Sequence, residues 1–130
     1  MNAKENNVFK QGQAWSYETR PGEKNSTVLI NLVESHPELG EIFHISMRDV
    51  RVKNPQAPSG MTTDLSHFPV SLQTLQESCT ALRGEEAPNP GFREGYAIWK
   101  AEFDEDRAGI FTISIAEIVG FIEKAINGEG

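Results

Sequence analysis

The first half of the chain alternates apolar and polar residues with the period of two that is typical of half-buried β-strands. The alternating runs are QAWSYET at 13–19 and EIFHISMRDVRVKN at 41–54, and the run between them, TVLINLVES at 27–35, is apolar on both faces, which places it centrally in the sheet. Turn-forming residues separate them, with Pro21 and Gly22 in the first gap and HPELG in the second. The pattern predicts an N-terminal three-stranded antiparallel meander.

The second half carries apolar residues at helical spacing, and three helices are predicted there. The first two stripes are Leu72, Leu75, Cys79 and Leu82, beginning after Ser71 as N-cap, and Phe92, Tyr96, Trp99 and Phe103 within 91–109. Ser114 and Glu117 form a capping box at the start of the third helix, and Gly128 stands where a C-terminal glycine belongs. Residues 109–113 (GIFTI) predict one further short strand. The expected fold class is therefore α+β, with three helices covering the meander.

The chain has 130 residues, which predicts a single domain spanning 1–130. Residues 1–10 are polar and are expected to be flexible. Residues 54–70 contain three prolines and show no periodicity, so they are predicted to form one long loop. Loops of that length in a compact domain are usually functional or disordered. The loop is therefore the natural place to look for chemistry.

Three residues in this loop, Asp64, Ser66 and His67, offer an acid, a hydroxyl and an imidazole. Adjacent side chains generally point apart, and no nucleophile motif surrounds Ser66, so a turn is the favoured interpretation. The alternative is a small hydrolase or ligand-binding protein that uses Asp64 and His67, with His44 as a third member. Three scattered histidines and the lack of a nucleotide-binding motif predict no metal site and no cofactor. Cys79, between leucines on its stripe, is read as a core residue.

The net charge of −7 is concentrated in the second half of the chain. The first 65 residues carry seven basic and eight acidic residues, and the last 65 carry five and eleven. Net charges of −1 and −6 follow, which argue against nucleic-acid binding and favour a basic protein partner. The candidate partner-binding residues are Glu85, Glu86, Glu102, Asp104, Glu105 and Asp106. Four of these carboxylates lie within five residues at a helix end and repel one another, which a cationic partner would relieve.

No stretch approaches the roughly 20 apolar residues that a membrane span needs, and the polar N-terminus lacks the apolar core of a secretory signal. A cytoplasmic location is therefore expected. Two hypotheses for function follow, and the sequence leaves the oligomeric state open. The first is a non-enzymatic acidic binding protein, as an immunity protein is for a basic toxin. The second is the small hydrolase or ligand-binding protein described above.

The segments GQAWSYETRPGE at 12–23, STVLINLVE at 26–34 and IFHISMRDVRVKNP at 42–55 share a resemblance, as does the tail from Tyr96. Together they are similar to an uncharacterised family of small bacterial proteins with the signature W-S-Y-x-T-R-P-G-E. The resemblance covers about residues 11–126. It implies a bacterial, single-domain protein, and it transfers no activity and no functional residue.

Overall fold

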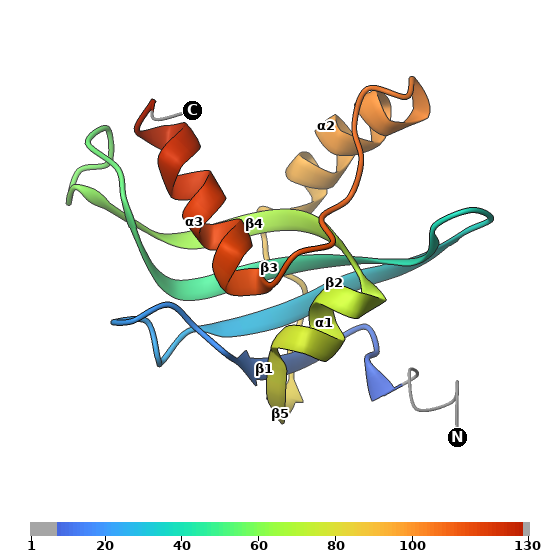
Figure 1. The fold of residues 1–130 in the computed structure, drawn as a ribbon, viewed down its shortest axis with the longest axis horizontal. Coiled ribbons are helices and arrows are strands. Elements are labelled where there is room, and N and C mark those ends of the chain that lie inside the picture. The colour runs from blue at the N-terminus through green and yellow to red at the C-terminus, as the bar shows by residue number, and fades with distance from the viewer. Residues whose placement is uncertain (1–7, 129–130) are drawn as a thin grey trace.

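A computed structural model describes residues 8–128, so the prediction of flexibility for residues 1–7 lies outside the described residues (Figure 1). Within 8–128 the chain forms five strands and three helices. The strands are β1 (Gln13–Tyr17), β2 (Thr27–His36), β3 (Gly40–Lys53), β4 (Met61–Ser71) and β5 (Cys79–Glu85), and the helices are α1 (Leu72–Ser78), α2 (Phe92–Asp104) and α3 (Ile115–Ile126). The strands make one antiparallel sheet in the order β4-β3-β2-β1-β5.

The α+β class is confirmed, but the predicted three-stranded sheet is wrong, because a strand is added at each edge. Residues 61–71 are not part of a loop: they form β4 and pair with β3, after a turn in which Asn54 N–H donates to the Gly60 carbonyl at 3.0 Å. Leu65 and Phe68 of β4 are buried opposite Met47 and Ile45. A bulge between these two pairs breaks the period of two, which hides the strand in the sequence.

The first predicted helix begins at Ser71 as expected but ends at Ser78. Residues 79–85 form β5 instead, which pairs with β1 and satisfies backbone groups that would otherwise face solvent at the sheet edge. Leu82 lies opposite Trp15 and remains 52% exposed, so its place in the helical stripe was misleading. The predicted strand at 109–113 is reduced to one bridge, in which Phe111 N–H donates to the Pro69 carbonyl at 2.9 Å.

The two faces of the sheet are covered by different elements. Phe43, Ile45 and Met47 of β3 point to one face, where α1 and α3 close the main core with Leu75, Ile115, Ile118 and Val119. Figure 1 shows α3 running across this face. His44 points to the opposite face, which α2 covers with its aromatic side chains. Within residues 8–128, no helix is both long and apolar enough to cross a membrane.

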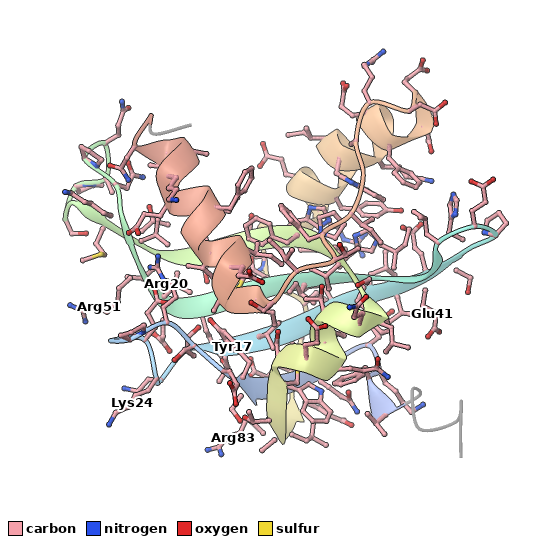
Figure 2. All side chains as sticks on the ribbon, in the orientation of Figure 1. Tyr17, Arg20, Lys24, Glu41, Arg51 and Arg83 are labelled. Carbon is pink, nitrogen blue, oxygen red and sulfur yellow. The ribbon has the colours of Figure 1, made fainter. Side chains whose placement is uncertain are left out.

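An ion-pair network fastens the β1–β2 turn to the C-terminal half of α3. The Arg20 guanidinium donates to both carboxylate oxygens of Glu23, at 3.0 and 2.7 Å, and to Glu123 at 2.9 Å. Glu23 is only 2% exposed, and it also accepts from the backbone N–H of Arg51 at 2.6 Å. In Figure 2, Lys24 projects away from the body of the molecule. The R-P-G-E segment therefore has a structural role in this turn.

Candidate functional site

Four polar side chains form a continuous hydrogen-bonded chain beneath α2. His44 of β3 is completely buried, and its Nε2 donates to Glu34 Oε1 of β2 at 2.7 Å. Its Nδ1 lies 2.9 Å from Nε2 of His67 on β4. The second carboxylate oxygen of Glu34 accepts from the Tyr96 hydroxyl of α2 at 2.8 Å. The chain, which we call the histidine relay (His67, His44, Glu34 and Tyr96), therefore connects three strands to the helix.

The hydrogen bonds of the histidine relay determine which nitrogens carry protons. Because the Glu34 carboxylate only accepts, His44 Nε2 carries a proton and its Nδ1 is left to accept from His67 Nε2–H. The two rings stack with centroids 5.1 Å apart. In this arrangement both histidines are neutral, as their lowered pKa values favour at pH 7, and each uses its Nε2 as donor.

The surroundings of the relay set the pKa of its members. Burial, with His44 alongside, lowers the pKa of His67 to about 4. Burial also lowers the pKa of His44, although the hydrogen bond to Glu34 opposes this shift. Burial raises the pKa of Glu34, but hydrogen bonds from Tyr96 and His44 outweigh it and the net pKa is lowered. A carboxylate beside two neutral imidazoles is therefore the stable arrangement at neutral pH.

The β4 bulge explains how His67 reaches this position. Ser66 and His67 together face the single residue Ser46 of β3, so the two neighbours lie on the same face of the sheet instead of pointing apart. Two glycines accommodate them, Gly91 at the N-cap of α2 and Gly95 within the helix: a Cβ at Gly91 would lie 3.1 Å from Ser66 Cβ, and a Cβ at Gly95 would lie 2.8 Å from His67 Cβ. The helix backbone therefore rests directly on β4.

The structure joins His67 to His44 but leaves Asp64 out of the relay. Asp64 is exposed, and its carboxylate accepts from Asn89 Nδ2 at 3.2 Å in the segment before α2. Sequence reasoning missed Glu34 and Tyr96. Tyr96 could have been found on the same helix face as Trp99, whereas Glu34 becomes a neighbour of His44 only through the β2–β3 register, which a bulge shifts after Ile30.

The relay is covered by aromatic rings and offers little room for a substrate. Phe92, Tyr96 and Trp99 all lie with ring centroids within 6.4 Å of the His44 ring. Neither His44 nor His67 lines the hollow at the β1–β2 turn, the hollow beside Pro88 or the hollow at the end of α2. Among residues 8–128, no group of three or more His, Cys, Asp or Glu could hold a metal ion. The relay therefore helps to hold α2 on the sheet.

The six acidic candidates do not form one patch. Glu85 and Glu86 lie at and just beyond the end of β5, where Glu86 pairs with Arg48. The other four are at the far end of α2 or just beyond it, so the length of this 13-residue helix intervenes. Two of these four are paired: Glu102 with Arg107 at 2.7 Å, and Asp104 with Lys100 at 3.1 Å.

Glu105 and Asp106 make no ion pair within the described residues, and Asp106 lines a hollow. The hollow has a volume of about 330 Å³ and separates the β2–β3 turn from the end of α2. We call it the α2 cleft, and its main lining residues are Glu38, Leu39, Phe103, Asp106 and Ile110. His36 closes one side, with its ring 5.4 Å from that of Phe103. Sequence reasoning missed the turn residues because only the fold brings them to α2.

Comparison with known proteins gives no relative from which a role could be transferred: no family model, no curated protein and no solved structure matches the chain. The resemblance to a small bacterial family stays a prediction. Its signature residues have structural positions here: Trp15 packs against the core, the Tyr17 hydroxyl lies 2.8 Å from Ser26 Oγ, and Arg20 binds Glu23. The function must therefore be argued from the site alone.

Proposed function

We propose that the protein is a non-enzymatic binding protein that receives a basic side chain of a partner protein in the α2 cleft. Binding of this kind would suit an immunity-type protein that neutralises a basic bacterial partner. The observation that carries the proposal is the presence, in one hollow, of an apolar wall and of carboxylates that make no ion pair among residues 8–128.

The cleft has the two kinds of surface that a lysine or arginine side chain needs. Such side chains pack an apolar stem against hydrophobic groups and keep a charged head in a polar environment. Leu39, which is 44% exposed, together with Phe103 and Ile110 supplies the apolar wall. Glu38 and Asp106 supply the carboxylates at the same hollow. A basic residue inserted here would bury its stem and gain charge-assisted hydrogen bonds.

The wider charge distribution supports the same class of partner. The second half of the chain carries a net charge of −6, and Glu105 stands beside Asp106 at the end of α2. A concentration of one sign accelerates association with an oppositely charged surface, and this effect weakens as salt is raised. A partner that relieved the repulsion between these neighbouring carboxylates would gain affinity from it. Binding should therefore be salt-dependent.

The experiment compares two variants that lose the same number of negative charges. The cleft variant is Glu38→Gln, Glu105→Gln and Asp106→Asn. Asparagine is chosen at 106 because this residue has a left-handed φ of 62°, which asparagine tolerates. The control variant replaces three exposed acids away from the cleft, namely Glu18, Glu85 and Glu94, by glutamine.

The tagged wild type and both tagged variants are used to capture proteins from a lysate of the source organism, at low and then at moderate salt. Calorimetry then measures the affinity of each of the three proteins for the captured protein. The wild type and the control should retain a basic protein in stoichiometric amount, and the cleft variant should bind it at least about tenfold more weakly, which corresponds to about 1.4 kcal/mol. Equal loss of binding in both variants would show that only net charge matters. That result, or an unchanged affinity of the cleft variant, would refute the α2 cleft as the binding site.

A further inference from the structure

Helix α2 is attached to the molecule in a different way from α3. The main core cluster contains Ile115, Ile118 and Val119 of α3, and among the described residues it contains no member of α2. Only Phe92, at the first turn of α2, is buried. Beyond that turn, the contacts of the helix with the sheet are the Tyr96 hydroxyl, the aromatic contacts with His44 and His67 and the close approach of Gly95 to His67. At its end, Phe103 contacts His36 beside the β2–β3 turn, and Trp99 Nε1–H donates to the Gly109 carbonyl in the segment that follows the helix. The attachment of α2 therefore depends on the histidine relay.

The relay has room for one additional proton but not for two. The neutral pair already holds one proton between its facing nitrogens, on His67 Nε2, so a first additional proton is bound at His67 Nδ1, and Glu34, 2.7 Å from His44, is the nearby counter-ion. A second proton would place N–H groups on both sides of a 2.9 Å gap, so the hydrogen bond would become a repulsion between two cations. The two rings are nearly parallel, with centroids 5.1 Å apart, and aromatic rings of α2 contact both of them, so this repulsion acts directly on the attachment of the helix.

The charged groups that face the pair do not offset a second positive charge. From β2, Glu34 is already engaged by His44 and by Tyr96. From α2, Lys100 adds positive potential at His44, and Asp104, one turn further on, is paired with Lys100. Tyr96 is neutral, because burial and the bond to Glu34 raise its pKa to about 12. Among the described residues, Glu34 is thus the single carboxylate that is hydrogen-bonded to the histidine pair.

We propose that acid releases α2 from the sheet through the His44–His67 pair, and that this release dismantles the α2 cleft. The release concerns the fold alone, whereas its effect on a partner rests on the proposed function. Phe103 belongs to α2, and Asp106 and Ile110 belong to the segment that follows it. These residues cannot keep their positions opposite Glu38 once the helix leaves the sheet.

The sign of the pH dependence follows from the protons bound in each state. When α2 is released, both histidines are solvated and bind protons with an ordinary pKa near 6.5. When α2 is docked, the pKa values of both are lowered, that of His67 to about 4. The released state therefore binds more protons between pH 6.5 and about 4, so docking is complete above this window and weakens as the pH falls through it. A difference of one proton corresponds to about a tenfold change in the docking equilibrium per pH unit.

The test measures hydrogen–deuterium exchange of the wild-type chain at pH 7.5, 6.5, 5.5 and 5.0, with rates corrected for the intrinsic effect of pH. Protection of the amides of residues 95–104 should fall by at least about tenfold between pH 6.5 and 5.0, while that of residues 115–126 changes less than about twofold. Equal changes in the two helices would mean global unfolding, and no change in α2 would mean that acid does not release it. Either result would overturn the proposal.

Two variants and one titration separate the relay from other titrating groups. His67→Gln keeps an N–H donor toward His44 but cannot be protonated, so the response of α2 to pH should be largely lost. His36→Gln is the matched control, because His36 lies outside the relay and accepts through Nδ1 from the amides of Glu38 and Leu39, each at 3.1 Å. Its response should equal that of the wild type. An unchanged response in His67→Gln would contradict the proposal.

If His67→Gln fails to fold, an NMR titration of the wild-type imidazoles tests the mechanism instead. Lowered pKa values are expected for His44 and His67, and a pKa of 6.5 or above for both would refute the mechanism. Partner binding is measured separately at pH 7.5 and 5.0. Release of α2 with undiminished binding would refute the α2 cleft as the binding site and leave the acid release standing. Loss of binding at pH 5.0 without release of α2 would refute the acid release and leave the α2 cleft standing as the binding site.

Discussion

Replacing Gly95 by alanine tests whether α2 rests on β4 as closely as the structure shows. In an exposed helix, glycine to alanine stabilises by about 1 kcal/mol, because glycine loses more backbone entropy on folding. Here the added Cβ would lie 2.8 Å from His67 Cβ, about 1 Å inside ordinary contact. That neighbour is fixed to the strand backbone and cannot rotate away, so helix or strand must shift.

The two effects have opposite signs, and their magnitudes decide the outcome. Overpacking a close contact costs about 1–3 kcal/mol. We expect the upper half of that range at Gly95, since the shift also strains the hydrogen bonds of the histidine relay. Subtracting the gain of about 1 kcal/mol in helix propensity leaves a net loss of about 1–2 kcal/mol in the free energy of unfolding. The melting temperature should fall by about 3–8 °C.

Gly120 of α3 is the matched control, because a Cβ there would meet nothing within 4 Å. Gly120→Ala should therefore stabilise the protein by up to about 1 kcal/mol. Urea unfolding followed by circular dichroism measures both variants against the wild type. Stabilisation of Gly95→Ala by as much as Gly120→Ala would show that α2 does not contact His67 and would refute the packing on which the relay depends.

Two further predictions concern the ion-pair network and the free thiol. Glu23→Ala should lower the free energy of unfolding by about 3 kcal/mol, because it leaves the partly buried Arg20 guanidinium without its bidentate partner. Glu105→Ala is the control, and it should change the free energy of unfolding by less than about 0.5 kcal/mol in the same urea titration. A loss below about 1 kcal/mol for Glu23→Ala would contradict the structural role of the network. Burial raises the pKa of Cys79 to about 12, so at pH 8 the native thiol should react with an aromatic disulfide only as fast as the chain opens. An immediate stoichiometric reaction would disprove the burial of this thiol.

The helices α2 and α3 could be predicted because their signals are local. The Ser114–Glu117 capping box is present, with Glu117 N–H donating to Ser114 Oγ at 3.2 Å, and it begins a helix whose apolar face is contained in 12 residues. For α2, the aromatic stripe predicted the helix although Gly95 has a low helix propensity. Only the close packing against His67 explains why a glycine stands at this position. Both helices are specified by residues within a few turns of one another.

The strands β4 and β5 could not be predicted because what makes them strands is their partner. The bulge at Ser66 and His67 hides the alternation of β4, and Pro69 is tolerated because β4 is an edge strand. In β5, Leu82 fits a helical stripe, yet the segment pairs with β1 because this pairing satisfies the backbone hydrogen-bonding groups at the edge of the sheet. The same dependence on register concealed Glu34, and with it the chemistry of the relay.

The attachment of α2 connects the candidate partner site with the histidine relay. A helix with one buried residue and no member in the main core cluster of the described residues is expected to open locally at a lower free energy than the rest of the fold. A ligand that binds only the docked form must raise that opening free energy by an amount set by its affinity and concentration. A basic partner seated between Glu38 and Asp106 should therefore slow exchange in α2 without affecting α3, and by the same linkage it should lower the pH at which His44 and His67 are protonated. Partner binding and proton binding at the relay are thus expected to oppose each other, even though the two sites share no residue.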